Sequence, residues 1–234
     1  MSAEVIRFED VSFSYGDLPV LVGVGFELGP GELVHLVGRS GAGKTTLLRL
    51  AHGQLRPRTG RVSVDGVLIL RGGDLRLWRR VHMVFQDPRL LPRLTALENV
   101  TYALRVVDLG LSAGEARRRA RGALCDAGLE ERLGAFPRRL SAGQRQLVAV
   151  ARAVACAPDV VLADEPTASL DAASADVVKG LFRRLTRTGA AVLLATCDAD
   201  VGELGRPGAG RVLRLEDGAL AEERPGGTRR WAAV

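Results

Sequence analysis

Nine consecutive residues near the start of the chain have the types and spacing that bind a phosphate chain. The stretch GRSGAGKTT, residues 38–46, fits the pattern G-x-x-x-x-G-K-[ST]. Its glycines let the backbone curl so that several N–H groups point at one anion, and a helix beginning there adds partial positive charge. We expect Lys44 to reach the β- and γ-phosphates of a nucleotide and Thr45 to offer its hydroxyl to Mg²⁺. The predicted nucleotide-binding residues are Gly38, Arg39, Ser40, Gly41, Ala42, Gly43, Lys44, Thr45 and Thr46.

Two carboxylates follow another apolar run, VVLADE, at residues 160–165. One interpretation is that such a pair, at the end of a strand, does no more than cap the next turn. Beside a phosphate-binding turn, however, a carboxylate can hold the metal or polarise an attacking water. We therefore predict that Asp164 lies beside Mg²⁺ and that Glu165 lies beside the γ-phosphate.

The elements that must position these groups are predicted from hydrophobic patterning. Residues 33–37 (LVHLV) and 81–85 (VHMVF) are continuous apolar runs, which is typical of buried strands. A helix is predicted after the glycine-rich turn and ends near Gly53. The order of strand, turn and helix is the context in which this turn binds nucleotides.

The region from 87 to 150 has a different character and is predicted to be mostly helical. Three helix starts are marked by Ser or Thr followed three residues later by Glu or Gln. These pairs are Thr95 with Glu98, Ser112 with Glu115, and Ser141 with Gln144. Because strands and a helix around 172–187 follow, the pattern predicts an α/β core interrupted by a helical insertion.

Composition restricts the class of protein. The chain has 234 residues and a net charge of +6, and arginine supplies nearly all of its positive charge. Its three cysteines, Cys125, Cys156 and Cys197, have no paired spacing, which argues against a disulfide framework or a zinc site. The charged N-terminus does not resemble a signal peptide, and no apolar run approaches the ~20 residues of a membrane helix. We expect a chain that reaches a membrane only through another protein.

The stretch RRLSAGQRQLVAVARA, residues 138–153, resembles the LSGGQ signature of the ATP-binding-cassette (ABC) ATPases. With it, residues 4–220 fall into register with that family. The resemblance implies a P-loop NTPase α/β core with an N-terminal antiparallel β subdomain and an inserted α-helical subdomain. The expected single domain, 1–234, comprises core segments 1–86 and 151–222, a helical subdomain 87–150 and a loose basic tail 223–234.

The resemblance also implies roles for single residues. Tyr15 corresponds to the aromatic that stacks on adenine, although a half-buried strand tyrosine is the alternative. Gln86 corresponds to the glutamine that touches the metal and the water, so the implied metal ligands are Thr45, Gln86 and Asp164. In this family two chains stack head to tail, and the signature of one caps the ATP of the other. The implied signature residues are Ser141, Ala142, Gly143 and Gln144, with Asp171 at the dimer seam.

Three residues depart from the family pattern. Ala142 replaces a glycine, and its methyl group either crowds the phosphate or is tolerated if φ is negative there. Leu147 stands where many relatives have Arg. Cys197 occupies the position of the switch histidine, which contacts the γ-phosphate. A neutral thiol is a weak donor and cannot be cationic, so we expect slower hydrolysis, on the order of 10²–10³-fold by analogy with oxyanion-hole deletions. The alternative is that water or a neighbouring group fills the gap and turnover is ordinary.

The function implied by the resemblance is that of a Mg-dependent ATPase subunit which drives a permease-like membrane protein from the inner, cytoplasmic face of the cell membrane. The cell-division branch, the FtsE type with an FtsX-type partner, fits the motifs best. ATPases of lipoprotein or macrolide exporters and of importers are alternatives, and so is an ATP-gated switch that scarcely hydrolyses. Whether the dimer pairs two identical or two different cassettes stays open. Nucleic-acid binding is disfavoured because aromatic residues make up only 4% of the chain.

Overall fold

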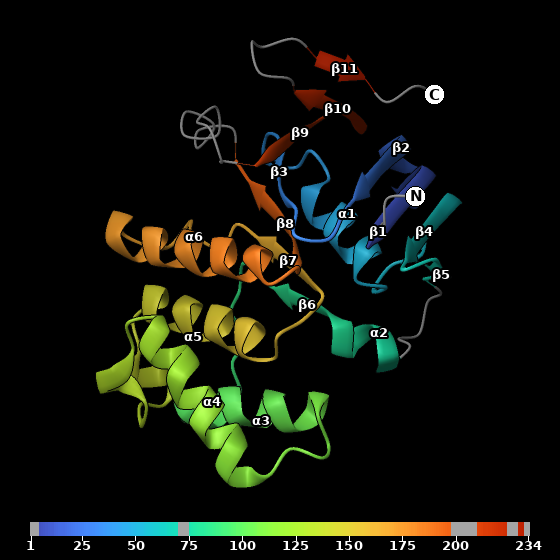
Figure 1. Ribbon diagram of the computed structural model, residues 1–234. Helices are drawn as coiled ribbons and strands as arrows, with labels where there is room; N and C mark the ends of the chain where they lie inside the picture. Colours follow the sequence, from blue (N-terminus) through green and yellow to red (C-terminus); the bar gives the residue numbers. More distant parts are fainter. Residues whose placement is uncertain (1–4, 70–74, 198–209, 224–228, 232–234) are drawn as a thin grey trace.

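A seven-stranded sheet forms the centre of the protein in the computed structural model, which describes residues 5–69, 75–197, 210–223 and 229–231 (Figure 1). The strand order is β11-β10-β9-β3-β8-β7-β6, and the five strands from β9 to β6 pair in parallel. The strands are β3 (Leu33–Val37), β6 (Val81–Val84), β7 (Val160–Asp164), β8 (Ala191–Thr196), β9 (Arg211–Glu216), β10 (Ala219–Glu223) and β11 (Arg229–Trp231). Because parallel strands end at the same edge, the residues after β3, β7 and β8 meet there.

A second, antiparallel sheet of four strands has the order β2-β1-β4-β5. Its strands are β1 (Ile6–Tyr15), β2 (Leu18–Leu28), β4 (Thr59–Val64) and β5 (Val67–Leu68). Phe8 and Phe26 stack across β1 and β2 with ring centroids 4.7 Å apart. β1 runs through Asp10, which adopts a left-handed φ of 48°, so β1 is one continuous but irregular strand.

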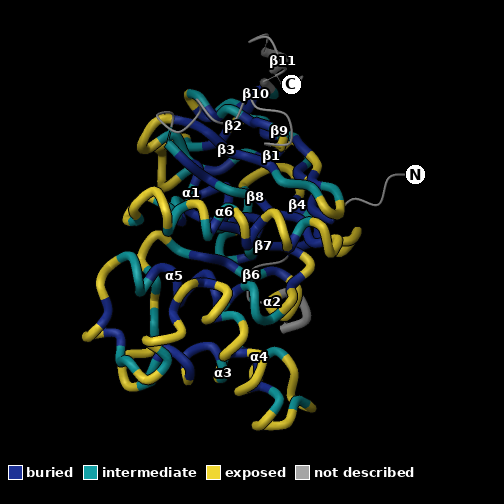
Figure 2. The backbone as a smooth tube through the Cα atoms, turned by 60° about the vertical axis from the view of Figure 1, so that its left-hand side comes forward, coloured by how far each residue is buried: buried dark blue, intermediate teal, exposed yellow. Residues whose placement is uncertain are grey.

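The helices lie on both faces of the central sheet. They are α1 (Lys44–Ala51), α2 (Leu75–Arg80), α3 (Ala96–Val107), α4 (Ala113–Asp126), α5 (Ala142–Ala155) and α6 (Ala172–Arg187), with short 3₁₀ turns at Glu130–Arg132 and Pro137–Arg139. Successive residues of β7 point to opposite faces. Val160 and Leu162 pack with α1 and the small sheet, whereas Val161 and Ala163 pack with α5 and α6. The central strands are therefore buried on both sides (Figure 2).

The sequence-predicted helix starts are confirmed by their hydrogen bonds. The side chains of Thr95 and Ser141 each accept a hydrogen bond from the backbone N–H three residues later. In return, the side chains of Glu98 and Gln144 accept the backbone N–H of the cap residue. Ser112 also accepts the N–H of Glu115. These caps fix where α3, α4 and α5 begin, and therefore where the helical part meets the sheet.

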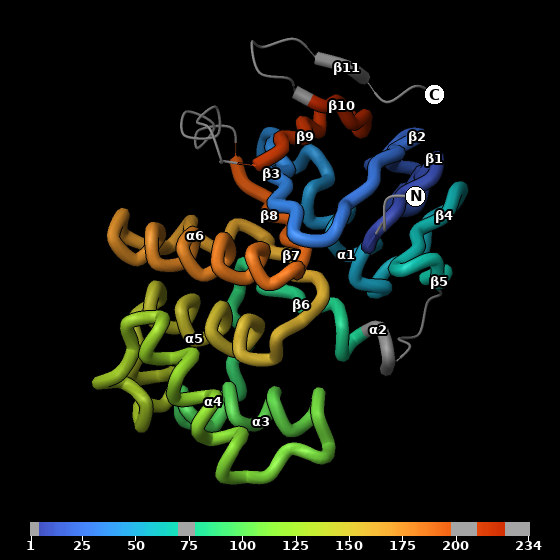
Figure 3. Tube along the Cα trace, in the orientation of Figure 1, coloured from blue at the N-terminus to red at the C-terminus, as the bar shows by residue number. Residues whose placement is uncertain are grey.

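Three features differ from expectation. Helix α2 was not predicted, because its six residues are too few to show a helical period. Helix α5 runs through the expected boundary at residue 150, so the helical part continues to Ala155. Within the expected loose tail, 223–234, residues Arg229–Trp231 pair with β10 as an edge strand. Figure 3 shows β9 (red) beside β3 (blue), although the two strands are far apart in the sequence.

Candidate active site

The glycine-rich turn spans residues 38–43, between β3 and α1. A side chain at Gly38 would place its Cβ 2.5 Å from the carbonyl oxygen of Leu215, on neighbouring strand β9. Gly43 has φ of 104°, and a Cβ there would lie 3.0 Å from Val20. Both fixed glycines of the pattern are thus required by close packing and backbone conformation, which holds the turn against the sheet.

Lys44 is the first residue of α1, and its side chain is 5% exposed. Its ammonium donates to the carbonyl oxygens of Gly38, at 2.6 Å, and of Arg39, at 3.1 Å. The same nitrogen lies 3.8 Å from Oε1 of Glu165. The cation is therefore held over the mouth of the turn, where it faces the second carboxylate of the acidic pair.

Thr45 and Asp164 come together across the edge of the sheet. The Thr45 hydroxyl donates to Oδ2 of Asp164 at 2.8 Å, although 119 residues separate them. Burial raises the pKa of Asp164 above its ordinary value, while the hydrogen bond from Thr45 opposes that shift. A hydroxyl and a carboxylate are hard oxygen ligands of the kind Mg²⁺ prefers, and Mg²⁺ takes its other ligands from water and phosphate. The pair fits a magnesium ion.

Glu165 follows β7 in a left-handed conformation, with φ of 46°. Its N–H donates to the carbonyl oxygen of Ala195 on β8 at 3.0 Å, which fixes this unusual backbone. Its Oε1 accepts a hydrogen bond from Sγ of Cys197 at 2.9 Å. The structure thus brings Lys44, Glu165 and Cys197 to one point.

Two further predicted residues lie in exposed positions near this edge. Tyr15 ends β1, is 46% exposed, and meets Phe13 edge-to-face at 5.0 Å. It pairs with Leu18 at the start of β2, the strand whose Val20 packs against Gly43. Tyr15 therefore lies at the end of the small sheet that approaches the turn. Gln86 is exposed in the loop after β6.

The signature stretch lies on the other face of the sheet, at the N-terminus of α5. Ser141 and Ala142 are exposed, and Ala142 takes the first helical position with negative φ, so its methyl group causes no strain. A Cβ on Gly143 would lie 3.2 Å from Leu170 and 3.3 Å from the carbonyl oxygen of Ser169. Only the second glycine of the pair is therefore needed for packing inside this chain.

Asp171 begins α6 and lies next to this contact. Its carboxylate accepts the N–H of Ser174 at 2.8 Å, and hydrogen bonds from backbone and side chain of Ser174 lower its pKa. Ser169 and Leu170, which Gly143 approaches, immediately precede it. The signature helix and the turn before α6 therefore form one packed unit.

Comparison with known proteins identifies the family. The family model described as ABC transporter matches residues 21–168. The chain belongs to the ABC transporter ATPases. It is 41% identical over 220 residues to the cell division ATP-binding protein FtsE of Escherichia coli K12, covering 92% of this chain and 97% of FtsE. It is 37% identical to the lipoprotein-releasing system ATP-binding protein LolD of Bacteroides thetaiotaomicron, covering 94% and 100%.

Solved structures agree with this assignment. The dimeric ATP-binding cassette MJ0796, bound to ADP and Pi in a post-hydrolysis state, superimposes with a TM-score of 0.84 at 33% identity, covering 95% of this chain and all of that one. The chain is therefore an ATP-hydrolysing enzyme with the ABC ATPase fold. No helix among the described residues has the length and apolarity required to span a membrane.

Two residues that the sequence did not single out tie the signature helix of this ABC ATPase to the loop of Gln86. Gln146 is 1% exposed, and its amide donates to the carbonyl oxygen of Phe85 at 3.2 Å. Arg152 donates to the carbonyl oxygens of Pro88, at 2.9 Å, and Arg89, at 3.0 Å. Both polar residues interrupt the mostly buried, apolar face of α5, which was the signal in the sequence. Leu147, the departure from Arg, is 6% exposed and packs in the core between α5 and the sheet.

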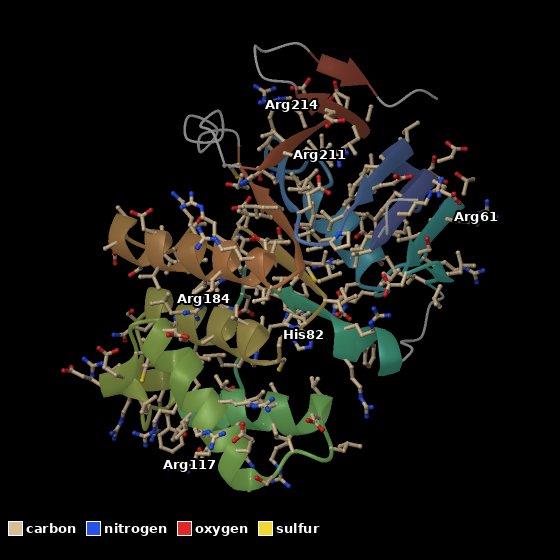
Figure 4. All side chains as sticks on the ribbon, in the orientation of Figure 1. Arg61, His82, Arg117, Arg184, Arg211 and Arg214 are labelled. Carbon is tan, nitrogen blue, oxygen red and sulfur yellow. The ribbon has the colours of Figure 1, made fainter. Side chains whose placement is uncertain are left out.

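A cavity of about 330 Å³ opens where α2, α3 and β6 meet the C-terminal half of α5. It is lined by His52, Trp78, His82, Leu91, Tyr102 and Arg152, among others. Figure 4 shows His82 at this junction. Burial lowers the pKa of His52 to about 4, so its imidazole is neutral at physiological pH. Trp78 and Tyr102 are 45% and 56% exposed, which leaves a large apolar surface at the rim.

Proposed function

We propose that this chain is the Mg-ATPase subunit of a membrane ABC complex of the FtsE type, coupling nucleotide-driven dimerisation to an FtsX-like membrane partner in cell division. The observation that carries the ATPase part is the meeting of Lys44, Thr45, Asp164 and Glu165 at one sheet edge. The similarity to FtsE over nearly the full length of both chains supports the branch.

In the proposed reaction, backbone N–H groups of residues 38–46 bind the phosphate chain of ATP. The ammonium of Lys44 moves from the carbonyls of Gly38 and Arg39 to the β- and γ-phosphate oxygens. Tyr15 stacks on adenine. Thr45, Asp164 and Gln86 would hold Mg²⁺, which neutralises charge on the phosphate oxygens.

Glu165 orients the attacking water in this scheme. Its carboxylate accepts a hydrogen bond from the water and polarises it toward the γ-phosphorus, so that water and ATP give ADP, phosphate and a proton. Before nucleotide binds, the Lys44 ammonium lies 3.8 Å from Oε1 of this carboxylate. Glu165→Gln replaces one carboxylate oxygen by an NH₂ donor and removes the negative charge, so it should stop polarisation of the water and leave ATP binding intact.

The working form is a dimer of cassettes, either two copies or two different chains. Ser141, Ala142, Gly143 and Gln144 would cap ATP on the opposing P-loop, with Asp171 at the seam. The exposure of Ser141 and Ala142 in the single chain and the helix N-terminus behind them support this role. The dimeric MJ0796 cassette supports the assembly.

The cavity beside α2 and α3 is the proposed docking site of the membrane partner, which the chain would bind from the cytoplasmic face of the membrane. Exposed Trp78, Leu91, Tyr102 and Val106 form an apolar rim of the kind that binds a partner helix. Nucleic acid is not a proposed partner. Arg61, Arg117 and Arg184 lie on separate parts of the molecule (Figure 4), and Arg61, Arg184 and Arg211 are paired with carboxylates.

Two alternatives have specific support. The similarity to LolD favours an exporter ATPase, which would dock a lipoprotein-exporter membrane protein in place of an FtsX-like one. Cys197, in place of the switch histidine, favours an ATP-gated switch with weakened or almost no hydrolysis.

The test is single-turnover hydrolysis of Mg-ATP at high protein concentration, with Glu165→Gln as the blank. Turnover above the blank supports the ATPase, whereas ATP binding without turnover favours the switch. For the branch, the chain is co-expressed with an FtsX-like protein or with the membrane subunits of a lipoprotein exporter. Co-purification with the first alone, lost on Tyr102→Asp, supports the cell-division role.

A further inference from the structure

The thiol of Cys197 contacts the same carboxylate oxygen that faces Lys44. Sγ lies 2.9 Å from Oε1 of Glu165, and the Lys44 nitrogen lies 3.8 Å from that oxygen. We propose that Cys197 is a positioning residue for hydrolysis. Its thiol donates to Glu165 and holds the carboxylate toward the phosphate-binding turn. The inference rests on the proposed ATPase function, because it assigns a role that acts through Glu165.

The two strands that lead to Glu165 and Cys197 set the backbone positions of both residues. Asp164 of β7 is in register with Ala195 of β8, and the N–H of Glu165 bonds to the carbonyl of Ala195. Cys197 follows two residues later, directly after β8 ends. Two neighbouring parallel strands therefore set the separation of thiol and carboxylate, although 32 residues lie between them in the chain.

The need for such a donor follows from the freedom of the glutamate side chain. Glu165 is 20% exposed and has three rotatable bonds, so an unrestrained carboxylate would sample several directions. Lys44 restrains it only while the ammonium is not engaged by phosphates. Once ATP draws Lys44 away, the thiol is the contact that persists. Catalysis depends on this orientation because small displacements of a reacting group lower the rate sharply.

This role separates two tasks that a histidine at position 197 would combine. A thiol can donate to Glu165, but it cannot present a cation to the γ-phosphate. In this assignment Cys197 orients the Glu165 carboxylate but does not make the cationic contact to the γ-phosphate that a histidine could make. The loss of the thiol should then lower kcat and leave KM for ATP unchanged.

The test compares Cys197→Ala, which removes the donor, with Cys197→Ser, which keeps one of similar size. We expect Cys197→Ala to lower kcat about tenfold, equivalent to about 1.4 kcal/mol, with KM within about twofold of wild type. Cys197→Ser should keep kcat within about threefold. Equal kcat for alanine, serine and wild type overturns the proposal, and so does a raised KM with unchanged kcat, which indicates a direct phosphate contact.

A vibrational measurement keeps the proposal testable if the protein does not hydrolyse ATP. The infrared difference between wild type and Cys197→Ser isolates the S–H stretching band of Cys197 from Cys125 and Cys156. Donation to a carboxylate lowers the frequency of this band, so Glu165→Ala should raise it. An unmoved band overturns the thiol–carboxylate contact. Absent turnover with a moved band overturns the ATPase function while leaving the contact established.

Discussion

The two ends of the proposed ATP sandwich are built differently within one chain. At the phosphate-binding edge, the polar side chains already contact one another: Thr45 bonds to Asp164, and Lys44 and Cys197 both approach Glu165. At the signature end, the side chains of exposed Ser141 and half-buried Gln144 bond within their own capping box.

The difference indicates which contacts are prepared before assembly. The phosphate-binding edge lies where three parallel strands end, so the sheet itself brings its residues together. The signature end lies away from the phosphate-binding turn of its own chain, since α5 packs on the opposite face of the sheet from α1. In the proposed dimer, each chain therefore supplies two half-sites, and hydrolysis would require a second cassette.

The largest expected effect comes from separating these half-sites. Lys44→Ala should abolish ATP binding, whereas Gly143→Asp should leave binding intact and lower hydrolysis on the order of 10²–10³-fold, because its carboxylate would crowd Leu170 and repel the opposing phosphate. Turnover is measured for each variant and for their equimolar mixture.

In the mixture, one composite site joins an intact P-loop to an intact signature, so activity should partly return. A mixture as inactive as its components contradicts the head-to-tail arrangement. Ala142→Gly is the matched control, and it should have little effect because Ala142 is exposed and unstrained.

A second prediction tests whether the phosphate-binding edge is complete. Cys197→His adds the imidazole that most relatives use, and we expect single-turnover hydrolysis to rise at least tenfold if the γ-phosphate contact is missing. An unchanged rate would mean that another group supplies this contact and that wild-type turnover is ordinary.

A third prediction concerns the cavity that we propose as the docking site of the membrane partner. The pKa of His52 is lowered from 6.5 to about 4, so the folded chain holds it neutral while the unfolded chain takes up a proton below pH 6.5. Its contribution to stability is complete above pH 6.5 and is lost as the pH falls toward 4, by at most about 3 kcal/mol. Urea unfolding at several pH values should show a shallower acid loss for His52→Gln.

A second variant separates the contribution of His52 to the pH dependence from that of His82. His82 also has its pKa lowered by burial, so His82→Gln should flatten the remaining slope. Identical pH profiles for wild type and both variants would show that neither imidazole is desolvated.

The smallest expected effect separates the stability of a helix cap from its catalytic use. Ser141→Ala and Ser112→Ala each remove a side chain that accepts the N–H three residues later, and each should lower the free energy of unfolding by about 1 kcal/mol. Only Ser141→Ala should also slow hydrolysis, because Ser112 caps α4, outside the proposed site. Equal activity losses would assign the effect of Ser141 to stability alone.

The sequence predicted those parts of the molecule that depend on local patterns. Buried strands, the glycine-rich turn and the caps at Thr95, Ser112 and Ser141 each involve residues only a few positions apart. The meeting of Thr45 with Asp164 was also predictable, because parallel strands end at one edge.

Contacts that depend on packing between distant segments could not be predicted from the sequence. The approach of Cys197 to Glu165 follows from the register of β7 and β8, which no single segment encodes. Helix α2 and strand β11 are too short to show a hydrophobic period in the sequence. Their formation depends on packing or pairing with neighbouring elements.

The bonds that tie α5 to the loop after β6 bear on how this protein can diversify. Gln146 and Arg152 bind the carbonyl oxygens of residues 85, 88 and 89, and every amino acid carries a carbonyl group. Side chains in this loop can therefore be exchanged without breaking the tie. A lineage can therefore change the side chains of this loop to suit a new membrane protein and still keep the hydrogen bonds that join the loop to the signature helix.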